Sequence, residues 1–282
     1  MTSSITPTLE KPGIVRRILA FPPVWLVLGA AAIAVFYMVI TGVASELSTP
    51  FQIGAALIGT AGSIGLYLLT MRVLTRRRTP ELRWAGGREF LLGGALGAFF
   101  IIASVLIVAA LGGYTVQWHP VDVFTTVMLA VAVNIGAAVI EELVFRGLAL
   151  QVFEKYVGPW IAIAATALLF GGAHMLNPGA SLWSGFAIAV EAGVLIGAAF
   201  VWRRNLWFAI GLHFVWNTVE SLFGIPVSGH HSPGLFETTV HGDDWLTGGS
   251  FGIEASFISV GLSLVLSALM IVAARRRIRA ER

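Results

Sequence analysis

Long apolar stretches recur along this chain, and they constrain its fold more than any other feature. A helix needs about 20 apolar residues to cross the hydrocarbon core of a bilayer. Eight candidate stretches run approximately over Val24–Val43, Phe51–Met71, Phe90–Leu111, Thr125–Leu150, Gly158–His174, Leu182–Trp202, Leu206–Phe223 and Ala255–Ala274. We therefore predict an all-α protein, a multi-span transmembrane helix bundle with about eight transmembrane helices.

The composition agrees with a chain that lives in a lipid bilayer. Only 12% of its 282 residues are charged and 57% are hydrophobic, whereas soluble domains carry about 25% charged residues. The chain has no cysteine, which excludes disulfides, thiolate metal sites and cysteine nucleophiles. The net charge of +3 comes from short basic runs beside apolar segments, so we interpret it as a topology signal and expect no nucleic-acid partner.

The basic residues predict the orientation, because Lys and Arg accumulate in cytoplasmic loops. They fall on one side of the predicted bundle, and the opposite loops carry mostly acidic residues. We predict an integral protein of a bacterial or archaeal cell membrane with both termini cytoplasmic. The expected organisation is three N-terminal helices (1–120), a catalytic core of helices four to seven (121–223), and an extracytoplasmic loop with the last helix and a basic tail (224–282).

Polar groups inside a membrane span are costly and mark functional sites. In this chain they gather in one half of the bundle: Asn134, Glu141, Glu142, Arg146, His174, Glu191, His213, Asn217 and Glu220. Residues four apart share a helix face, so Glu142 and Arg146 can neutralise each other. Glu141 is then left on a neighbouring face without a local cation. His213 and Asn217 share a face in the same way.

A structural interpretation competes with a functional one. Polar side chains can act as interhelical hydrogen-bond glue, and an adjacent Glu and Arg can be a buried pair; for Glu142 with Arg146 we favour this interpretation. Unpaired groups on three separate helices, such as Glu141, His174 and His213, instead require a common polar cavity.

Such a cavity suits hydrolysis. A carboxylate in a low-dielectric site has a raised pKa and can act as a general base near neutral pH, which fits Glu141. Two imidazoles, from His174 and His213, could bind a divalent ion such as Zn²⁺ together with Glu141, or could donate hydrogen bonds to an oxyanion. Asn217 could stabilise an oxyanion or orient a water molecule. The HExxH zinc motif is absent.

The same residues carry a family resemblance. EExxxR (Glu141, Glu142, Arg146), FxxxH (Phe170, His174) and HxxxN (His213, Asn217) follow one another on three spans. In this order they resemble the CPBP family of intramembrane proteases, which includes the type II CAAX prenyl endopeptidases and the abortive infection proteins.

The resemblance implies an intramembrane metalloendopeptidase that hydrolyses a membrane-associated peptide or protein. Glu141 would activate water, and Glu142 with Arg146 would hold the site together. His174 and His213 would bind the metal or polarise the scissile carbonyl, and Asn217 would stabilise the oxyanion. The oligomeric state and the substrate's identity do not follow from it.

Two other functions fit the same residues. A catalytically inactive scaffold or immunity protein would act by binding a partner, and a proton-coupled transporter would use Glu and His as a relay. One geometric problem also remains in the sequence. Straight helices at about 1.5 Å per residue, with the boundaries given above, would separate Glu141 from His174. We expect the fourth helix to continue toward Phe153, and we expect the cavity to open at the cytoplasmic ends of the spans.

Overall fold

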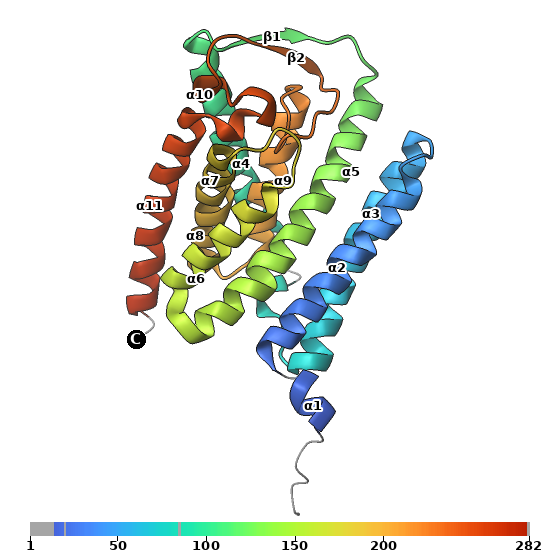
Figure 1. Ribbon diagram of the computed structural model, residues 1–282, viewed down its shortest axis with the longest axis vertical. Helices are drawn as coiled ribbons and strands as arrows, with labels where there is room; N and C mark the ends of the chain where they lie inside the picture. The colour runs from blue at the N-terminus through green and yellow to red at the C-terminus, as the bar shows by residue number, and fades with distance from the viewer. Residues whose placement is uncertain (1–13, 20, 84–85, 281–282) are drawn as a thin grey trace, which may run out of the picture.

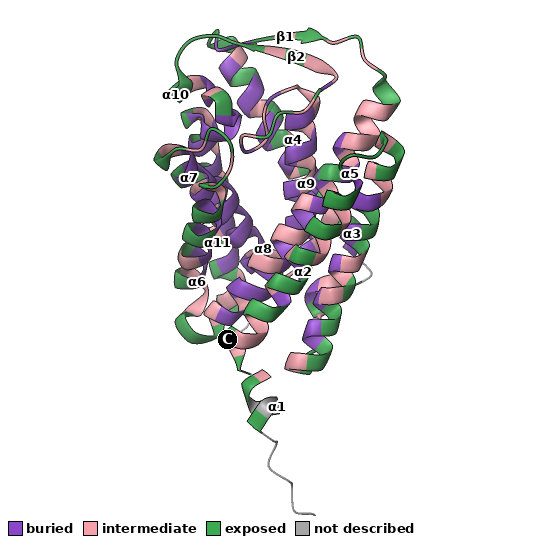
Figure 2. Ribbon diagram, turned by 45° about the vertical axis from the view of Figure 1, so that its right-hand side comes forward, coloured by how far each residue is buried: buried purple, intermediate pink, exposed green. Residues whose placement is uncertain are grey.

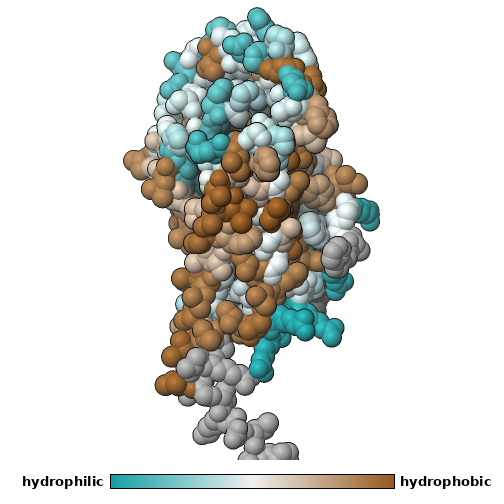
Figure 3. Space-filling model, turned by 90° about the vertical axis from the view of Figure 1, so that its right-hand side faces the viewer, coloured by the Kyte–Doolittle hydropathy of each residue, from teal (hydrophilic) through white to brown (hydrophobic). Residues whose placement is uncertain are grey.

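A computed structural model describes residues 14–19, 21–83 and 86–280. The chain is a helical bundle, as predicted (Figure 1). Within the described residues, six helices are long and apolar enough to cross a membrane. Figure 3 shows a hydrophobic band around the middle of one face, with hydrophilic residues toward both ends. The protein is therefore an integral membrane protein, and the number of eight spans stays a prediction.

The first half of the bundle is built from antiparallel helices. A short α1 (Ile14–Leu19) leads into α2 (Pro22–Ala44), which packs along α3 (Thr49–Thr70) and its π-helical extension η1 (Met71–Thr75). The 3-10 turn η2 (Pro80–Leu82) precedes α4 (Gly87–Ala110). These helices carry about half of the exposed large apolar side chains, as expected for surfaces that face lipid.

A 52-residue helical segment follows, and it holds the fourth and fifth predicted spans. It consists of α5 (Val123–Glu142), π-helical η4 (Leu143–Leu150) and α6 (Gln151–His174). Gly158 breaks it with φ 75°, a conformation that favours glycine, and Pro159 follows at the start of the returning helix. The chain therefore doubles back at this point, at the foot of the bundle in Figure 1.

The remaining helices complete the bundle. A central helix consists of α7 (Leu182–Ile188), π-helical η5 (Ala189–Ile196) and α8 (Gly197–Arg203), and nearly all of its second half is buried. It is followed by α9 (Leu206–Leu222) and by α11 (Phe257–Ala280). Figure 2 shows that buried residues gather on the inner helices. The described chain begins and ends at the same end of the bundle (Figure 1).

The opposite end carries a cap that contains regular structure. There β1 (Tyr114–Trp118) pairs antiparallel with β2 (Phe236–Val240), and α10 (Asp244–Thr247), η6 (Gly249–Phe251) and η7 (Ile253–Ala255) follow. The sequence predicted an all-α fold with an extracytoplasmic loop here, and no sheet. The two short strands were missed because their partner segments lie more than 100 residues apart, which local patterns cannot reveal.

Candidate active site

The helix reversal at Gly158 determines the height at which Glu141 and His174 lie in the bundle. Glu141 lies 17 residues before this turn and His174 lies 16 residues after it, so at about 1.5 Å per residue both sit roughly 25 Å above it. The expected extension of the fourth helix past Leu150 is confirmed, and it removes the separation that the shorter boundary implied. Glu141 Oε2 lies 4.0 Å from His174 Nε2 and 3.8 Å from His213 Nε2.

Each imidazole is oriented by a contact to its other ring nitrogen. His174 Nδ1 donates to the carbonyl oxygen of Phe170, 2.8 Å away and four residues earlier. His213 Nδ1 lies 2.9 Å from Oε1 of Glu142. These contacts leave both Nε2 atoms directed toward Glu141. The two Nε2–Oε2 separations are longer than a direct hydrogen bond, and one water molecule can bridge gaps of this size.

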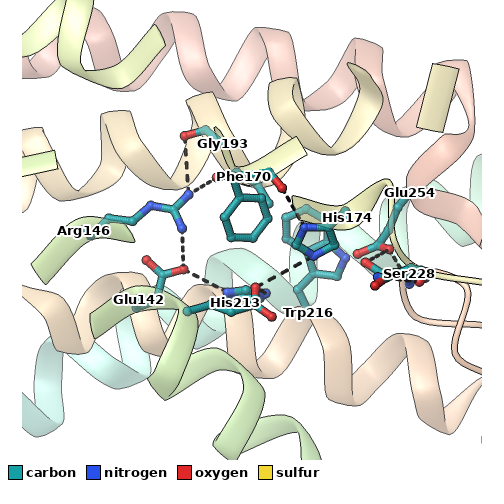
Figure 4. Close-up of polar contacts among 12 residues, drawn as sticks. Glu142, Arg146, Phe170, His174, Gly193, His213, Trp216, Ser228 and Glu254 are labelled. Carbon is teal, nitrogen blue, oxygen red and sulfur yellow. Dashed lines mark hydrogen bonds and ion pairs between the residues drawn. The ribbon is translucent and has the colours of Figure 1, made fainter. Parts of the chain in front are cut away.

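The neighbouring glutamate has a different role. Arg146 Nη1 donates to Glu142 Oε1 over 2.8 Å, and both side chains are almost completely buried. Arg146 Nη2 also donates to the carbonyl oxygens of Ala192 and Gly193 (Figure 4). This confirms that Glu142 and Arg146 pair. The pair connects its own helix to η5 through Arg146 and to α9 through the contact between Glu142 and His213.

Two π-helical segments flank the pair: η4 contains Arg146, and η5 contains Ala192 and Gly193. π-helical turns are rare and occur often at functional sites. The Phe170 ring stacks on His174, with ring centroids 4.5 Å apart, and Arg146 Cζ lies 5.0 Å from the Phe170 centroid. The phenylalanine of the FxxxH motif thus supports both the histidine and the arginine.

These residues form the deep end of a cavity of about 760 Å³. Asn217 lines it beside His213, and Asn134 lines it two turns before Glu141 on α5. The predicted residues that line it are thus Glu141, His174, His213, Asn217 and Asn134, whereas Glu142 and Arg146 lie behind the lining. Glu191 and Glu220 are fully buried and do not line the cavity.

Sequence reasoning missed several residues at the cavity rim. His230 and His231, which belong to none of the motifs, line the cavity. Ser228 anchors this loop, because its backbone N and Oγ donate to Glu254 over 2.6 and 2.7 Å, and its carbonyl oxygen accepts from Asn177. No pattern in the sequence could pair Ser228 with Glu254, since Ser228 lies in a loop and Glu254 lies 26 residues later in the short η7. The loop is therefore held as a preformed rim.

The cavity extends away from the end where the described chain starts and finishes. Its outermost lining residues come from the first turns of α3 and α5 and from the loop at 227–233, at the capped end. The expectation that the cavity opens at the opposite, basic end is wrong. Because the helix that carries Glu141 continues far beyond Leu150, Glu141 lies near the middle of the bundle and not near the foot.

The site has donors of the kind that a divalent metal ion uses. Glu141 Oε2 is buried and has no hydrogen-bond partner among the described residues, and two imidazole Nε2 atoms face it. Imidazole nitrogen and carboxylate oxygen are common zinc ligands. However, no group of three or more His, Asp or Glu side chains in the described ranges is arranged as a metal site. These residues therefore have the chemistry of metal ligands, but their side chains would have to move to coordinate one ion together.

Fold and site together define a polytopic membrane protein with a buried Glu, His and Asn cavity. Residues 122–219 match the family described as type II CAAX prenyl endopeptidase, Rce1-like. The match runs from the start of α5 to Val219 in α9 and includes all six predicted catalytic residues, and it supports the assignment to the CPBP family. No curated protein and no solved structure matches the chain significantly.

Proposed function

We propose that this protein is an intramembrane endopeptidase that hydrolyses peptide bonds of membrane-associated polypeptides with a water molecule activated by Glu141. One observation carries the proposal: the Oε2 atom of Glu141 faces two imidazole Nε2 atoms at the deep end of a cavity in the membrane-spanning bundle. The match to type II CAAX prenyl endopeptidases supports the reaction class.

In this proposal the Glu141 carboxylate accepts a proton from water while the water oxygen attacks the scissile carbonyl carbon. Asn217 and a doubly protonated histidine, through its Nε2–H, donate hydrogen bonds to the oxyanion that forms. The C–N bond then breaks, and Glu141 returns the proton to the leaving amine nitrogen. Glu142 and Arg146 act indirectly, since Glu142 fixes the His213 ring through Nδ1.

A divalent ion would be held by Glu141, His174 and His213, and it would supply Lewis-acid polarisation of the carbonyl or of the water. Support for it is the donor chemistry of these three side chains. Whether or not an ion takes part, the position of Glu141 between the two rings serves proton transfer.

The test is cleavage of a panel of fluorogenic, membrane-anchored peptides by the full chain in detergent. Glu141→Gln should lower the rate by about a hundredfold or more, as expected for loss of a general base. Glu191→Gln is the matched control, because Glu191 lies inside the bundle but does not line the cavity; this variant should keep its rate. Loss after chelation, with recovery on adding Zn²⁺, would support metal assistance.

Other outcomes would change the conclusion. Cleavage that survives Glu141→Gln would remove Glu141 from the role of base. If the folded wild-type chain cleaves no peptide of the panel, a binding scaffold becomes the better interpretation, and its partner binding should then tolerate Glu141→Gln.

A further inference from the structure

The cavity leads from the catalytic residues toward one end of the bundle only. From Glu141, its lining follows α5 back to Thr125, 16 residues earlier, which is about 24 Å along the helix. The mouth is completed by Gln52 on α3 and by His231 of the rim loop. A polypeptide would therefore reach Glu141 from the capped end.

Toward the other end of the bundle, packed side chains close the cavity below Glu141. Directly beneath Glu141 lie the buried Glu142 and Arg146, and Leu143 and Leu148 are fully buried on the same helix. Phe170, 1% exposed, fills the space between Arg146 and His174. None of the described residues at the other end lines the cavity.

The two ends of the bundle differ completely in basic charge. Apart from Arg146, every Lys and Arg of the described chain lies at the end away from the cap. Two of these arginines form ion pairs with glutamates at this end: Arg203 pairs with Glu89, and Arg204 pairs with Glu154. The capped end instead carries exposed acidic residues, namely Glu46, Asp122, Glu237, Asp243 and Asp244.

Because Lys and Arg accumulate on the cytoplasmic side of membrane proteins, we infer that the cavity opens to the extracytoplasmic face and that the substrate is the extracytoplasmic juxtamembrane segment of a membrane-anchored polypeptide. The substrate part of this inference rests on the proposed function. It excludes a lipidated C-terminus in the cytoplasm as the substrate, since such a chain end would meet the sealed end of the bundle.

The cavity wall agrees with a substrate that leaves the lipid next to the site. On α5 the wall includes Leu129, Val133 and Ala137, and Val133 is 48% exposed on the bundle surface. None of the described lining residues is Lys or Arg, so the cavity offers no permanently charged partner for a free C-terminal carboxylate. It suits an uncharged internal segment of a chain.

Cysteine labelling tests the orientation without requiring any activity, because the natural chain has no cysteine. His231→Cys places a thiol at the cavity mouth, and Ala280→Cys is the control at the end of α11; both positions are exposed. The full chain is expressed in a bacterial host, and spheroplasts are treated with a membrane-impermeant maleimide. His231→Cys should be labelled equally before and after permeabilisation, whereas Ala280→Cys should be labelled only afterwards. The reverse pattern would overturn the inference.

Two substrates then test the side of cleavage. Both carry one cleavable sequence, taken from a peptide that the purified chain cleaves, placed either just outside or just inside a single transmembrane anchor. Only the extracytoplasmic version should be cut, and Glu141→Gln should abolish the cut. Cleavage of the cytoplasmic version would refute the inference while leaving the protease intact. If the purified chain cleaves no peptide, the proposed function fails, and the labelling still decides which face the cavity opens to.

Discussion

Arg146 and Glu142 allow a quantitative test of the buried framework behind the site. Their side chains are 2% and 0% exposed, with 2.8 Å between Nη1 and Oε1. At an effective dielectric constant of about 20, two unit charges at this distance attract by about 6 kcal/mol, and much of this offsets their desolvation. Removing one partner leaves the other charge buried, which costs about 3–5 kcal/mol. Arg146→Met should therefore lower the free energy of unfolding by about this amount.

The assay is SDS-induced unfolding in mixed micelles, followed by circular dichroism. Arg203→Met is the matched control, because Arg203 also pairs with a glutamate but keeps 28% of its side chain exposed; partly exposed pairs contribute about 0–1 kcal/mol. Glu142→Gln combined with Arg146→Met should be less destabilised than Arg146→Met alone, since no uncompensated charge remains. The reasoning would be refuted if Arg146→Met cost no more than Arg203→Met.

Three further predictions concern packing, a buried hydrogen bond and pH. A Cβ on Gly97 would collide with the backbone of α9, so Gly97→Val should cost about 1–3 kcal/mol in the same unfolding assay, whereas Gly65→Val, with open space around it, should cost less. Tyr67 donates to Glu81 over 2.6 Å in a buried setting, and Tyr67→Phe should lower the free energy of unfolding by about 2 kcal/mol; an unchanged value would show that the bond does not form. Burial raises the pKa of Glu254 above 4.5, so its contribution to stability is complete below that pH and is lost as the pH rises toward the raised value. Unfolding measured from about pH 4 to 8 should therefore show a smaller decline for Glu254→Gln than for wild type, and equal declines would contradict the assignment.

The helical class of this protein and the identity of its site residues could be predicted from local sequence. Apolar stretches of bilayer length leave few alternatives to membrane-spanning helices, because the backbone must satisfy its hydrogen bonds within each segment. The i, i+4 spacing predicted that Glu142 and Arg146 share one helix face and that Glu141 lies on a neighbouring face. The structure confirms that Glu142 pairs with Arg146. Spacing along one helix is a local property, so the sequence carried it in full.

The meeting of Glu141 with His174 depended on where the chain turns. A boundary at Leu150 would have kept them apart, and the reversal at Gly158 brings them to one level. Hydropathy alone did not predict where the fourth helix ends. The residues between Leu150 and Gly158 can form a helix whether they lie inside the membrane or outside it.

What the sequence by itself determined is the helical membrane bundle, the chemical groups of the site and the separation of basic from acidic loops. Only the tertiary structure decided that His213 is held by Glu142, that Ser228 and Glu254 fix the rim, and that the cavity runs toward the acidic end. The physical reason is that these features join segments far apart in the chain. Their geometry depends on how whole helices pack, which no local pattern of residues encodes.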